Sequence, residues 1–345
     1  MRRMKSLLAI TFLFLLISGS AAQTQPQPDG AIVERTPCGP HPFSNYEQYA
    51  EARKRRFAED VEAAKSEGFR REAPKDFTRL LMSREEFEKR KAYAGFECQR
   101  IKYLSDRLKV VGFIWKPKDT AGRKFPLIIF NRGGNREFGK VMPWMMSGFH
   151  EYLAHGFVVV ASQYRGNDGG EGKEEFGGAD VGDVLNLIPL TKSLGYVDMS
   201  NVFILGVSRG GMMSLLALKN GIPVNAAAVI GALADLTSQQ EQRQLMVEGV
   251  YKQLIPDFGK RGAEAMRERS AVYWPEKINA PLLILQGGAD WRVDTKTNAL
   301  ALAQKLQESG KTYELIVYAG DDHGLSFNAA DSERRVIDWF KRHMK

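Results

Sequence analysis

The sequence predicts an α/β fold in which a mostly parallel central sheet is covered by helices on both faces. From about residue 100 to the C-terminus, short apolar runs alternate with segments of helical spacing. That order is typical of parallel strands joined by helical crossovers. The apolar runs are continuous, with no polar residue at every second position, which suits strands buried on both faces. With 345 residues and 43% hydrophobic content, the chain can bury a large core.

A hairpin and six apolar runs are the expected strands. The hairpin is expected within residues 101–118, ahead of the central strands. The central strands are expected at 126–130, 157–162, 202–207, 225–232, 281–286 and 313–318. Helical spacing lies between and after them, with apolar side chains at Val181, Val184, Leu185 and Ile188, and at Val336, Trp339 and Phe340. These stripes predict amphipathic helices that pack on the sheet.

The first 22 residues have the pattern of a secretory signal peptide. Basic residues precede an apolar run from Leu7 to Ile17, and the small residues that follow place cleavage after Ala22. The run is short for a membrane span, and no later segment reaches about 18 uninterrupted apolar residues. The mature protein is therefore expected to be exported, either periplasmic or secreted, without stable insertion in the membrane.

Three parts are expected after the signal peptide. Residues 23–99 form a linker and a helical N-terminal extension, and a capping box at Ser83–Glu86 is expected to start one of its helices. Residues 100–345 form the catalytic-sized domain. An insertion at about 233–277 has helical patterns and is expected to cap the pocket.

The two cysteines permit one disulfide. Cys38 and Cys98 would meet in an oxidising compartment, and a bridge between them would add about 2–4 kcal/mol to the free energy of unfolding. The alternative is two unpaired thiols. No CxxC motif or nearby histidine pair accompanies the cysteines, so no set of metal ligands can be drawn from them.

The formal net charge of +8 does not indicate a nucleic-acid partner. Part of it belongs to the signal peptide, and much of the rest lies in residues 51–75, where acidic and basic residues interleave. Mixed charge of this kind is typical of a solvated helix face. The sequence also lacks a basic stripe studded with aromatic residues. The expected partner is a small-molecule or peptide substrate, and nothing in the sequence specifies an oligomeric state.

Ser208 is the candidate nucleophile. It lies in "GVSRG", residues 206–210, between the apolar run at 202–207 and an apolar helical pattern. A G-x-S-x-G sequence at a strand-to-helix turn is typical of a nucleophile elbow, because the glycines permit a sharp turn that side chains would obstruct. The N-terminus of the following helix also favours developing negative charge.

A serine hydroxyl needs a base, and the base needs a partner that fixes its tautomer. His323 is the candidate base, because it stands in the polar loop "YAGDDHGLS" after the last expected strand. Asp290 is the candidate acid, because it leaves the preceding strand through two glycines toward the same edge of the sheet. The order Ser208, Asp290, His323 is that of an α/β-hydrolase. The alternatives for the acid are Asp294, Asp321 and Asp322.

Two donors are expected to stabilise the oxyanion that forms when Ser208 attacks a carbonyl. The backbone amide of Arg209 follows from the elbow. The second donor is expected in the loop "NRGGNREFG", and it is Asn131, Arg132 or Gly133.

From about Ile101 to the C-terminus the chain resembles the catalytic domain of the prolyl oligopeptidase (S9) group of α/β-hydrolases. The likeness lies in "FNRGG", "QYRGNDGGEG", "YVDMSNVFILGVSRGGMMSL", "RSAVYWPEKINAPLLILQGGADWRV" and "DDHG", in that order. The resemblance implies an α/β-hydrolase fold, Ser208, Asp290 and His323 as nucleophile, acid and base, and no cofactor.

The departures from this family concern the substrate. Its peptidases often carry a large β-propeller before the catalytic domain, and the N-terminal segment is too short to form one. Arg209 stands where relatives tend to hold tyrosine, so its side chain is where substrate preference is expected to differ. The predicted function is an exported serine hydrolase that cleaves a peptide or ester bond through an acyl-enzyme on Ser208. The alternatives are a carboxylesterase acting on small acyl or sugar esters, and a non-catalytic binding protein on a hydrolase scaffold.

Overall fold

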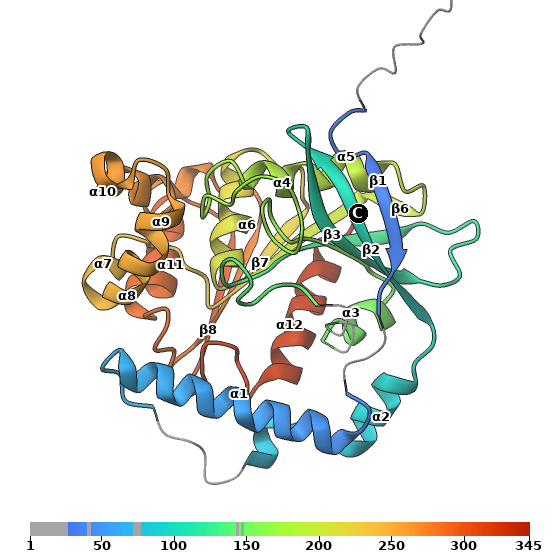
Figure 1. The fold of residues 1–345 in the computed structure, drawn as a ribbon, viewed down its shortest axis with the longest axis horizontal. Coiled ribbons are helices and arrows are strands. Elements are labelled where there is room, and N and C mark those ends of the chain that lie inside the picture. The colour runs from blue at the N-terminus through green and yellow to red at the C-terminus, as the bar shows by residue number, and fades with distance from the viewer. Residues whose placement is uncertain (1–26, 40–42, 72–76, 143–144, 146–147) are drawn as a thin grey trace, which may run out of the picture.

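The computed structural model describes residues 27–39, 43–71, 77–142, 145 and 148–345, so the expected signal peptide and its cleavage point lie outside the described residues. The described strands form one nine-stranded sheet in the order β1-β2-β3-β5-β4-β6-β7-β8-β9 (Figure 1). They are β1 (Ile32–Pro37), β2 (Phe96–Ser105), β3 (Leu108–Pro117), β4 (Phe125–Asn131), β5 (Val158–Ser162), β6 (Val197–Val207), β7 (Ala226–Ile230), β8 (Leu282–Gly287) and β9 (Tyr313–Tyr318). Neighbours from β5 through β9 pair in parallel, and β1, β2 and β3 add an antiparallel edge.

Helices cover both faces of the sheet, which confirms the predicted fold class. One face carries α4 (Val181–Leu185), α5 (Leu187–Lys192), α6 (Arg209–Lys219) and α11 (Ala301–Glu308), and the other carries α3 (His150–Ala154) and α12 (Ala329–Arg342). The side chains of β4 alternate between these two cores, with Leu127 and Ile129 in one and Ile128 and Phe130 in the other. Because both faces are buried, the central strands read as continuous apolar runs.

The N-terminal edge of the sheet differs from the expectation. Residues 23–42 were expected as linker, but β1 pairs with β2, and β2 begins at Phe96, before the expected hairpin. Five of the six residues of β1 are exposed. An edge strand held by main-chain hydrogen bonds to a single neighbour needs no apolar pattern, so its residues carry no strand signal.

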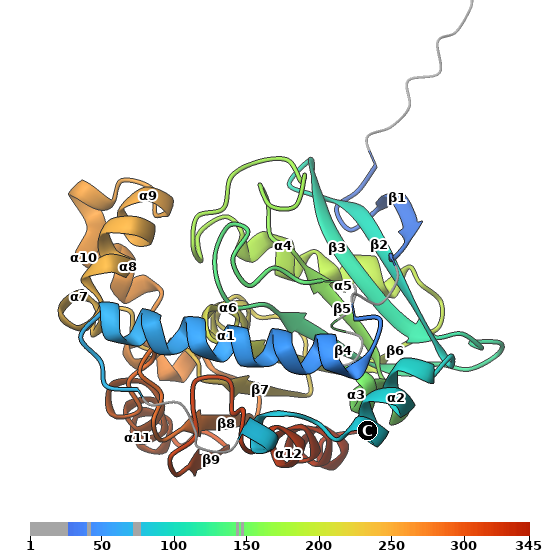
Figure 2. The same ribbon diagram turned by 60° about the horizontal axis from the view of Figure 1, so that its bottom comes forward.

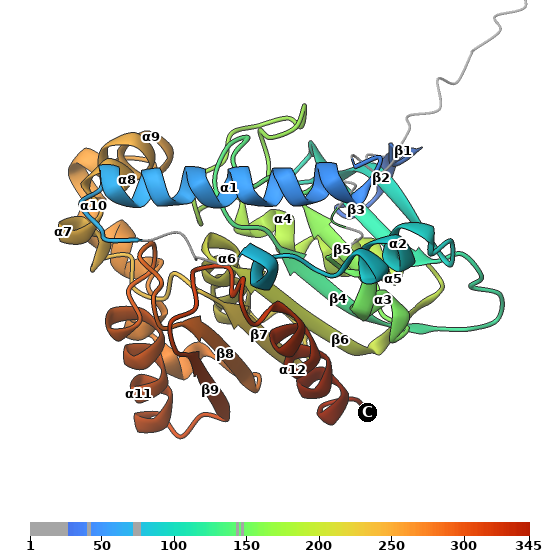
Figure 3. The ribbon, with the colours of Figure 1, turned by 90° about the horizontal axis from the view of Figure 1, so that it is seen from below.

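The N-terminal extension crosses the molecule before it returns to the sheet. Its helices are α1 (Tyr46–Ser66), the 3₁₀-helix η1 (Phe77–Leu80) and α2 (Arg84–Ala92). Figures 2 and 3 show α1 running from the neighbourhood of α2 toward α7 and α8 in the insertion. A disulfide joins Cys38, next to β1, to Cys98 in β2 across 60 residues of sequence. The extension is therefore a loop closed by a covalent bond at its base.

Two local expectations for helices can be compared with the structure. Ser83 caps α2, since its side chain accepts a hydrogen bond from the Glu86 amide at 3.1 Å. The glutamate does not complete the reciprocal capping box, because its carboxylate binds Arg90 instead. The insertion at 233–277 is helical, and its buried side chains Val250, Tyr251 and Leu254 belong to the main core. Its helices are α7 (Gln239–Gln242), α8 (Gln244–Met246), the π-helix η3 (Val247–Tyr251), α9 (Lys252–Leu254), α10 (Phe258–Glu268) and the 3₁₀-helices η4 (Ala271–Tyr273) and η5 (Pro275–Lys277).

Among the described helices, none combines the length and the apolar character needed to cross a membrane.

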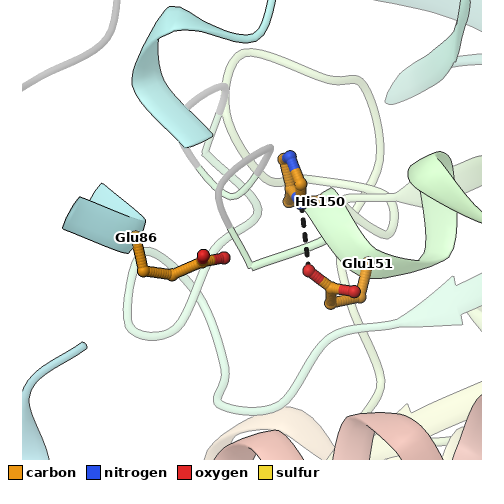
Figure 4. Close-up of side chains that lie close together, drawn as sticks. All are labelled: Glu86, His150 and Glu151. Atoms are coloured by element: carbon orange, nitrogen blue, oxygen red, sulfur yellow. Dashed lines mark hydrogen bonds and ion pairs between the residues drawn. The ribbon is translucent and has the colours of Figure 1, made fainter. Parts of the chain in front are cut away.

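A cluster of charged side chains fastens the extension to the catalytic domain. Glu86 of α2 lies close to His150 and Glu151 of α3, and the His150 ring accepts or donates at Nδ1 to Glu151 across 3.1 Å (Figure 4). The atoms of these three residues that could bind a metal ion lie within 4.8 Å of one another. The guanidinium of Arg90 already lies 2.6 Å from Glu86, 3.5 Å from Glu151 and 3.7 Å from Glu333 of α12. This arginine supplies positive charge that three carboxylates share.

Stability is expected to depend on pH through Glu333. Burial, opposed by Arg90 and reinforced by Glu151 and Glu86, raises the pKa of Glu333 to about 7 from an ordinary value of 4.5. Because the folded protein holds this proton more tightly than the unfolded chain, stability is lost as the pH rises from 4.5 through 7. Glu333→Gln cannot ionise, so its stability relative to the wild type should improve by about 2–3 kcal/mol between pH 5 and pH 8.

Urea unfolding of both proteins at the two pH values measures this difference. A stability difference that is the same at pH 5 and pH 8 would show that the Glu333 carboxyl does not titrate differently in the two states.

Candidate active site

Ser208 stands at the sharp turn between β6 and α6. Its backbone has φ 58° and ψ −124°, a strained combination for a residue with a side chain, of the kind that clusters at functional sites. A Cβ on Gly206 would come 2.1 Å from the Gly210 carbonyl oxygen, and a Cβ on Gly210 would come 1.9 Å from the Asn131 carbonyl oxygen. Only glycine fits at these two positions, so the G-x-S-x-G pattern reflects the close packing of α6 on β4 and β6.

Asp290 and His323 are in direct contact after β8 and β9. Nδ1 of His323 lies 2.7 Å from Oδ2 of Asp290. The other carboxylate oxygen of Asp290 accepts the backbone amides of Arg292 at 2.9 Å and Val293 at 3.0 Å. The Asp290 side chain is completely buried, whereas the His323 ring is 16% exposed. This arrangement fixes the aspartate and leaves one face of the imidazole open.

Ser208 and His323 both lie against the end of β7, at the neighbouring residues Ile230 and Gly231. The Ser208 amide donates to the Ile230 carbonyl oxygen at 2.9 Å. A Cβ built on the next residue, Gly231, would lie 3.0 Å from Nδ1 of His323. The turn after β6 and the loop after β9 therefore pack against the same two residues, at the carboxyl edge of the sheet where ligands bind in such folds.

The three alternative acids hold loops in place. Asp294 accepts the backbone amide and the hydroxyl of Thr297. Asp321 accepts the Phe327 amide and the Asn328 side chain. Asp322 accepts the amides of Gly324 and Ser326. Asp290, and none of these three, is the carboxylate that contacts Nδ1 of His323.

Gly133 is the one of the three candidates for the second oxyanion donor that lies against the nucleophile. A Cβ built on it would lie 3.1 Å from the Ser208 Cβ and 3.7 Å from Oγ. Asn131 is completely buried, and its side-chain amide donates to the Ser214 hydroxyl at 2.9 Å. Arg132 is also completely buried, and it donates to main-chain carbonyl oxygens of Gly133, Arg136, Phe138 and Gln163. The side chains of Asn131 and Arg132 are therefore already engaged in hydrogen bonds within the protein. The backbone of Gly133 is left as the candidate for the second oxyanion donor.

The Arg209 side chain, expected to be where substrate preference differs from that of relatives, is buried and therefore not open to a substrate. Arg209 is 2% exposed, and its guanidinium lies 2.6 Å from Glu174 and 2.6 Å from Asp180. The rings of Tyr164 and Phe176 lie 5.0 and 4.5 Å from it. An arginine enclosed in this way contributes to the site by holding neighbouring segments in place through its hydrogen bonds.

The Arg209 network ties the elbow to the Gly133 loop. Arg209 Nη1 donates to the Gly134 carbonyl oxygen at 3.1 Å, and Glu174 accepts the Arg136 amide at 2.6 Å. Burial raises the pKa of Glu174, but the charge and hydrogen bond of Arg209 outweigh burial and hold that pKa below its ordinary value. The residue after the nucleophile therefore holds the loop opposite the nucleophile.

Three residues that support the site, Glu174, Asp180 and Asp60, could not be predicted from the sequence. Glu174 and Asp180 lie in a glycine-rich loop, where their role is visible only once Arg209 is known to be buried. Asp60 lies in the N-terminal extension. Its carboxylate accepts hydrogen bonds from the side chains of Trp291 and Arg292, which directly follow Asp290. In the sequence, the Trp291–Arg292 pair after Asp290 could have suggested a contact there, but it does not indicate which residue the pair contacts.

Sequence comparisons place this site in a known family. Residues 144–345 match the family model described as the prolyl oligopeptidase family. The chain is 30% identical over 244 residues to the uncharacterized peptidase YtmA of Bacillus subtilis, covering 70% of this chain and 91% of that protein. It is 29% identical over 251 residues to acylamino-acid-releasing enzyme 1 of Oryza sativa subsp. japonica, covering 66% of this chain but 31% of that enzyme.

Solved structures share the fold at lower identity. The uncomplexed acylaminoacyl peptidase of Pyrococcus horikoshii superposes with a TM-score of 0.64 at 21% identity, covering 77% of this chain and 44% of that one. An acylaminoacyl peptidase in complex with Z-Gly-Gly-Phe-chloromethyl ketone gives a TM-score of 0.63 at 21% identity, with the same coverage. This chain therefore spans less than half of these larger proteins. The family match over more than half of the chain, together with the likeness to nearly all of YtmA, shows that the chain belongs to the prolyl oligopeptidase family.

Proposed function

We propose that this serine hydrolase cleaves an acyl bond through a covalent intermediate on Ser208. The observation that carries the proposal is the 2.7 Å contact between buried Asp290 and Nδ1 of His323, beside the strained elbow. With Nδ1 held by Asp290, Nε2 is the ring nitrogen that accepts the Ser208 proton as Oγ attacks the substrate carbonyl. The resulting imidazolium then protonates the leaving group. Water attacks the acyl-enzyme in the second half of the reaction, and His323 again removes the proton.

The developing oxyanion has two candidate donors in this arrangement. The Arg209 amide is the first of α6, and the first amides of a helix have no carbonyl partner within the helix. The backbone amide at Gly133 is the second, because this residue packs against Ser208. Each such donor typically lowers the barrier by about 3 kcal/mol.

A peptide or acylated amino acid is the substrate class that we favour. The relatives include an enzyme named for releasing acylamino acids and a fold neighbour that holds a peptide chloromethyl ketone. The alternative is a carboxylesterase acting on small acyl or sugar esters. A non-catalytic role on a hydrolase scaffold is the least supported, since Asp290 and His323 keep a catalytic geometry.

We also propose that the protein is exported. The support is the signal-peptide pattern of residues 1–22 and the Cys38–Cys98 disulfide. Structural disulfides persist in oxidising compartments and are rare where thiols are kept reduced.

Covalent labelling with a fluorophosphonate probe tests the nucleophile. The wild-type protein should be labelled at Ser208 and Ser208→Ala should not, since the probe reacts only with an activated hydroxyl. Mass spectrometry of the labelled peptide identifies the residue. A correctly folded wild-type protein that stays unlabelled would contradict the proposed chemistry.

Substrate class is tested by a direct comparison of amide and ester turnover. If the substrate is a peptide, kcat/KM for acyl-aminoacyl and aminoacyl p-nitroanilides should be of the same order as for matched p-nitrophenyl esters. A carboxylesterase would turn over only the esters at a useful rate, because an amine is a poorer leaving group and needs well-placed protonation. Ser208→Ala serves as the blank in both assays.

Arg209 supplies a prediction about the loop that carries the second oxyanion donor. Arg209→Lys keeps the charge but cannot contact Glu174, Asp180 and Gly134 together, because an ammonium is a point charge rather than a planar fork. We expect kcat to fall by roughly tenfold or more with a smaller change in KM, since the loss acts on the transition state. Arg165→Lys is the matched control, because Arg165 is also buried and paired with Asp183 at 2.8 Å. The control should lower the melting temperature and leave kcat nearly unchanged, and equal losses of kcat in both variants would refute the assigned role.

A further inference from the structure

The N-terminal extension contacts the two loops that carry Asp290 and His323. Figures 2 and 3 show α1 lying across the loop side of the sheet toward the insertion. Near the C-terminal end of this helix, Asp60 faces the residues that follow Asp290. Just beyond the helix, Arg71 reaches the residue that precedes His323.

Both carboxylate oxygens of Asp60 bind the loop after β8 that carries Asp290, called the acid loop below; the loop after β9 that carries His323 is called the histidine loop. Oδ1 accepts Nε of Arg292 at 2.9 Å, and Oδ2 accepts the indole Nε1 of Trp291 at 3.2 Å. The Arg292 amide is itself one of the donors that fix the Asp290 carboxylate, together with the Val293 amide and the Gln286 side chain. The extension therefore holds, through Asp60, the same residue that orients the acid.

Arg71 joins this contact to the histidine loop. Its Nε lies 3.0 Å from Asp60, its Nη2 lies 2.7 Å from Asp322, and its side chain is 9% exposed. Asp322 in turn accepts the amides of Gly324 and Ser326, so its carboxylate organises the backbone on the far side of His323. Burial raises the pKa of Asp322, but its hydrogen bonds to Ser326 and Arg71 outweigh burial and hold it below the ordinary value. The Arg71 guanidinium also lies 4.6 Å from the ring of Phe57 in α1.

The same end of the extension reaches the insertion. Glu67 accepts Nη2 of Arg243 at 2.6 Å, and Nη1 of Arg243 donates to the Arg292 carbonyl oxygen at 2.9 Å. The Arg243 guanidinium lies 4.7 Å from the Trp291 ring, and the Phe69 ring lies 5.7 Å from it. The acid loop is therefore enclosed between the extension and the insertion.

We infer that Asp60 and Arg71 are positioning residues that hold the acid loop and the histidine loop in register, so that the N-terminal extension is a working part of the catalytic centre. The two loops also meet directly, through the contact of Asp290 with His323 and through the Ala289 amide, which donates to the Asp321 carbonyl oxygen at 2.8 Å. Asp60 and Arg71 brace this junction from outside. Displacing a catalytic group by about 1 Å can cost about a hundredfold in rate. The inference rests on the proposed function, because it assigns Asp290 and His323 their catalytic roles.

The test compares Arg71→Lys, Arg71→Met and Asp60→Asn with the wild type and with Arg84→Ala. Arg84 lies in the same extension and pairs with Glu47, but this ion pair is exposed and lies at the other end of α1. For each protein, the second-order rate of fluorophosphonate labelling, kcat and KM are measured at 25 °C, together with the melting temperature.

We expect labelling and kcat to fall roughly ten- to a hundredfold in Arg71→Met and Asp60→Asn, with a smaller change in KM. Arg71→Lys should recover part of the rate, because an ammonium can reach one of the two carboxylates. Arg84→Ala should match the wild type. The losses must occur in variants that are fully folded at the assay temperature.

Two outcomes would overturn the inference alone. One is a labelled wild type with folded Arg71 and Asp60 variants that react at the same rate. The other is a loss of rate found only in variants that have unfolded by 25 °C. An unlabelled wild type would instead overturn the proposed function, and the inference would fall with it.

Discussion

The close approach of the α6 N-terminus to the end of β4 is the constraint on which the rest of the site depends. With the Gly210 Cα packed on the Asn131 carbonyl oxygen, no side chain fits between the helix and the strand. That contact forces Ser208 into its left-handed backbone conformation and brings Gly133 against it. A hydrophobic core alone would not demand so tight a crossing. The strain is tolerated because both neighbours of the turn are buried elements that cannot relax.

Arginine side chains that are buried or nearly buried hold the loops around the site in place. Arg209 and Arg132 are buried and the Arg71 side chain is largely buried, and each binds groups from two or more segments of the chain. A guanidinium has five donors in one plane, so it can satisfy several carbonyl or carboxylate oxygens that apolar packing could not order. Buried ion pairs are weak contributors to net stability. Their value here is geometric, since they fix irregular backbone around a regular sheet.

The sequence was sufficient for features that follow from local pattern. The apolar run at 281–286 became β8 (Leu282–Gly287), whose six residues are all buried, because a strand buried on both faces needs apolar residues throughout. Asp290 and His323 could be paired because the ends of adjacent parallel strands must meet at one edge. It was not sufficient for β1, whose edge position needs no pattern, or for the direction of the Arg209 side chain. The contact of Asp60 with Arg292 spans 232 residues, and nothing local to either residue indicates the other.

The disulfide at the base of the extension has a consequence for the contacts at its far end. Residues 39–97 are confined to a closed loop by the Cys38–Cys98 bond, so Arg71 cannot diffuse far from Asp322 even when their ion pair opens. In the language of tethered ligands, the bond sets a high effective concentration of one group around the other. Reduction would leave every residue of the chain in place and still dilute that interaction. A structural cross-link more than 25 residues away in sequence can thus govern how often the histidine loop is correctly held.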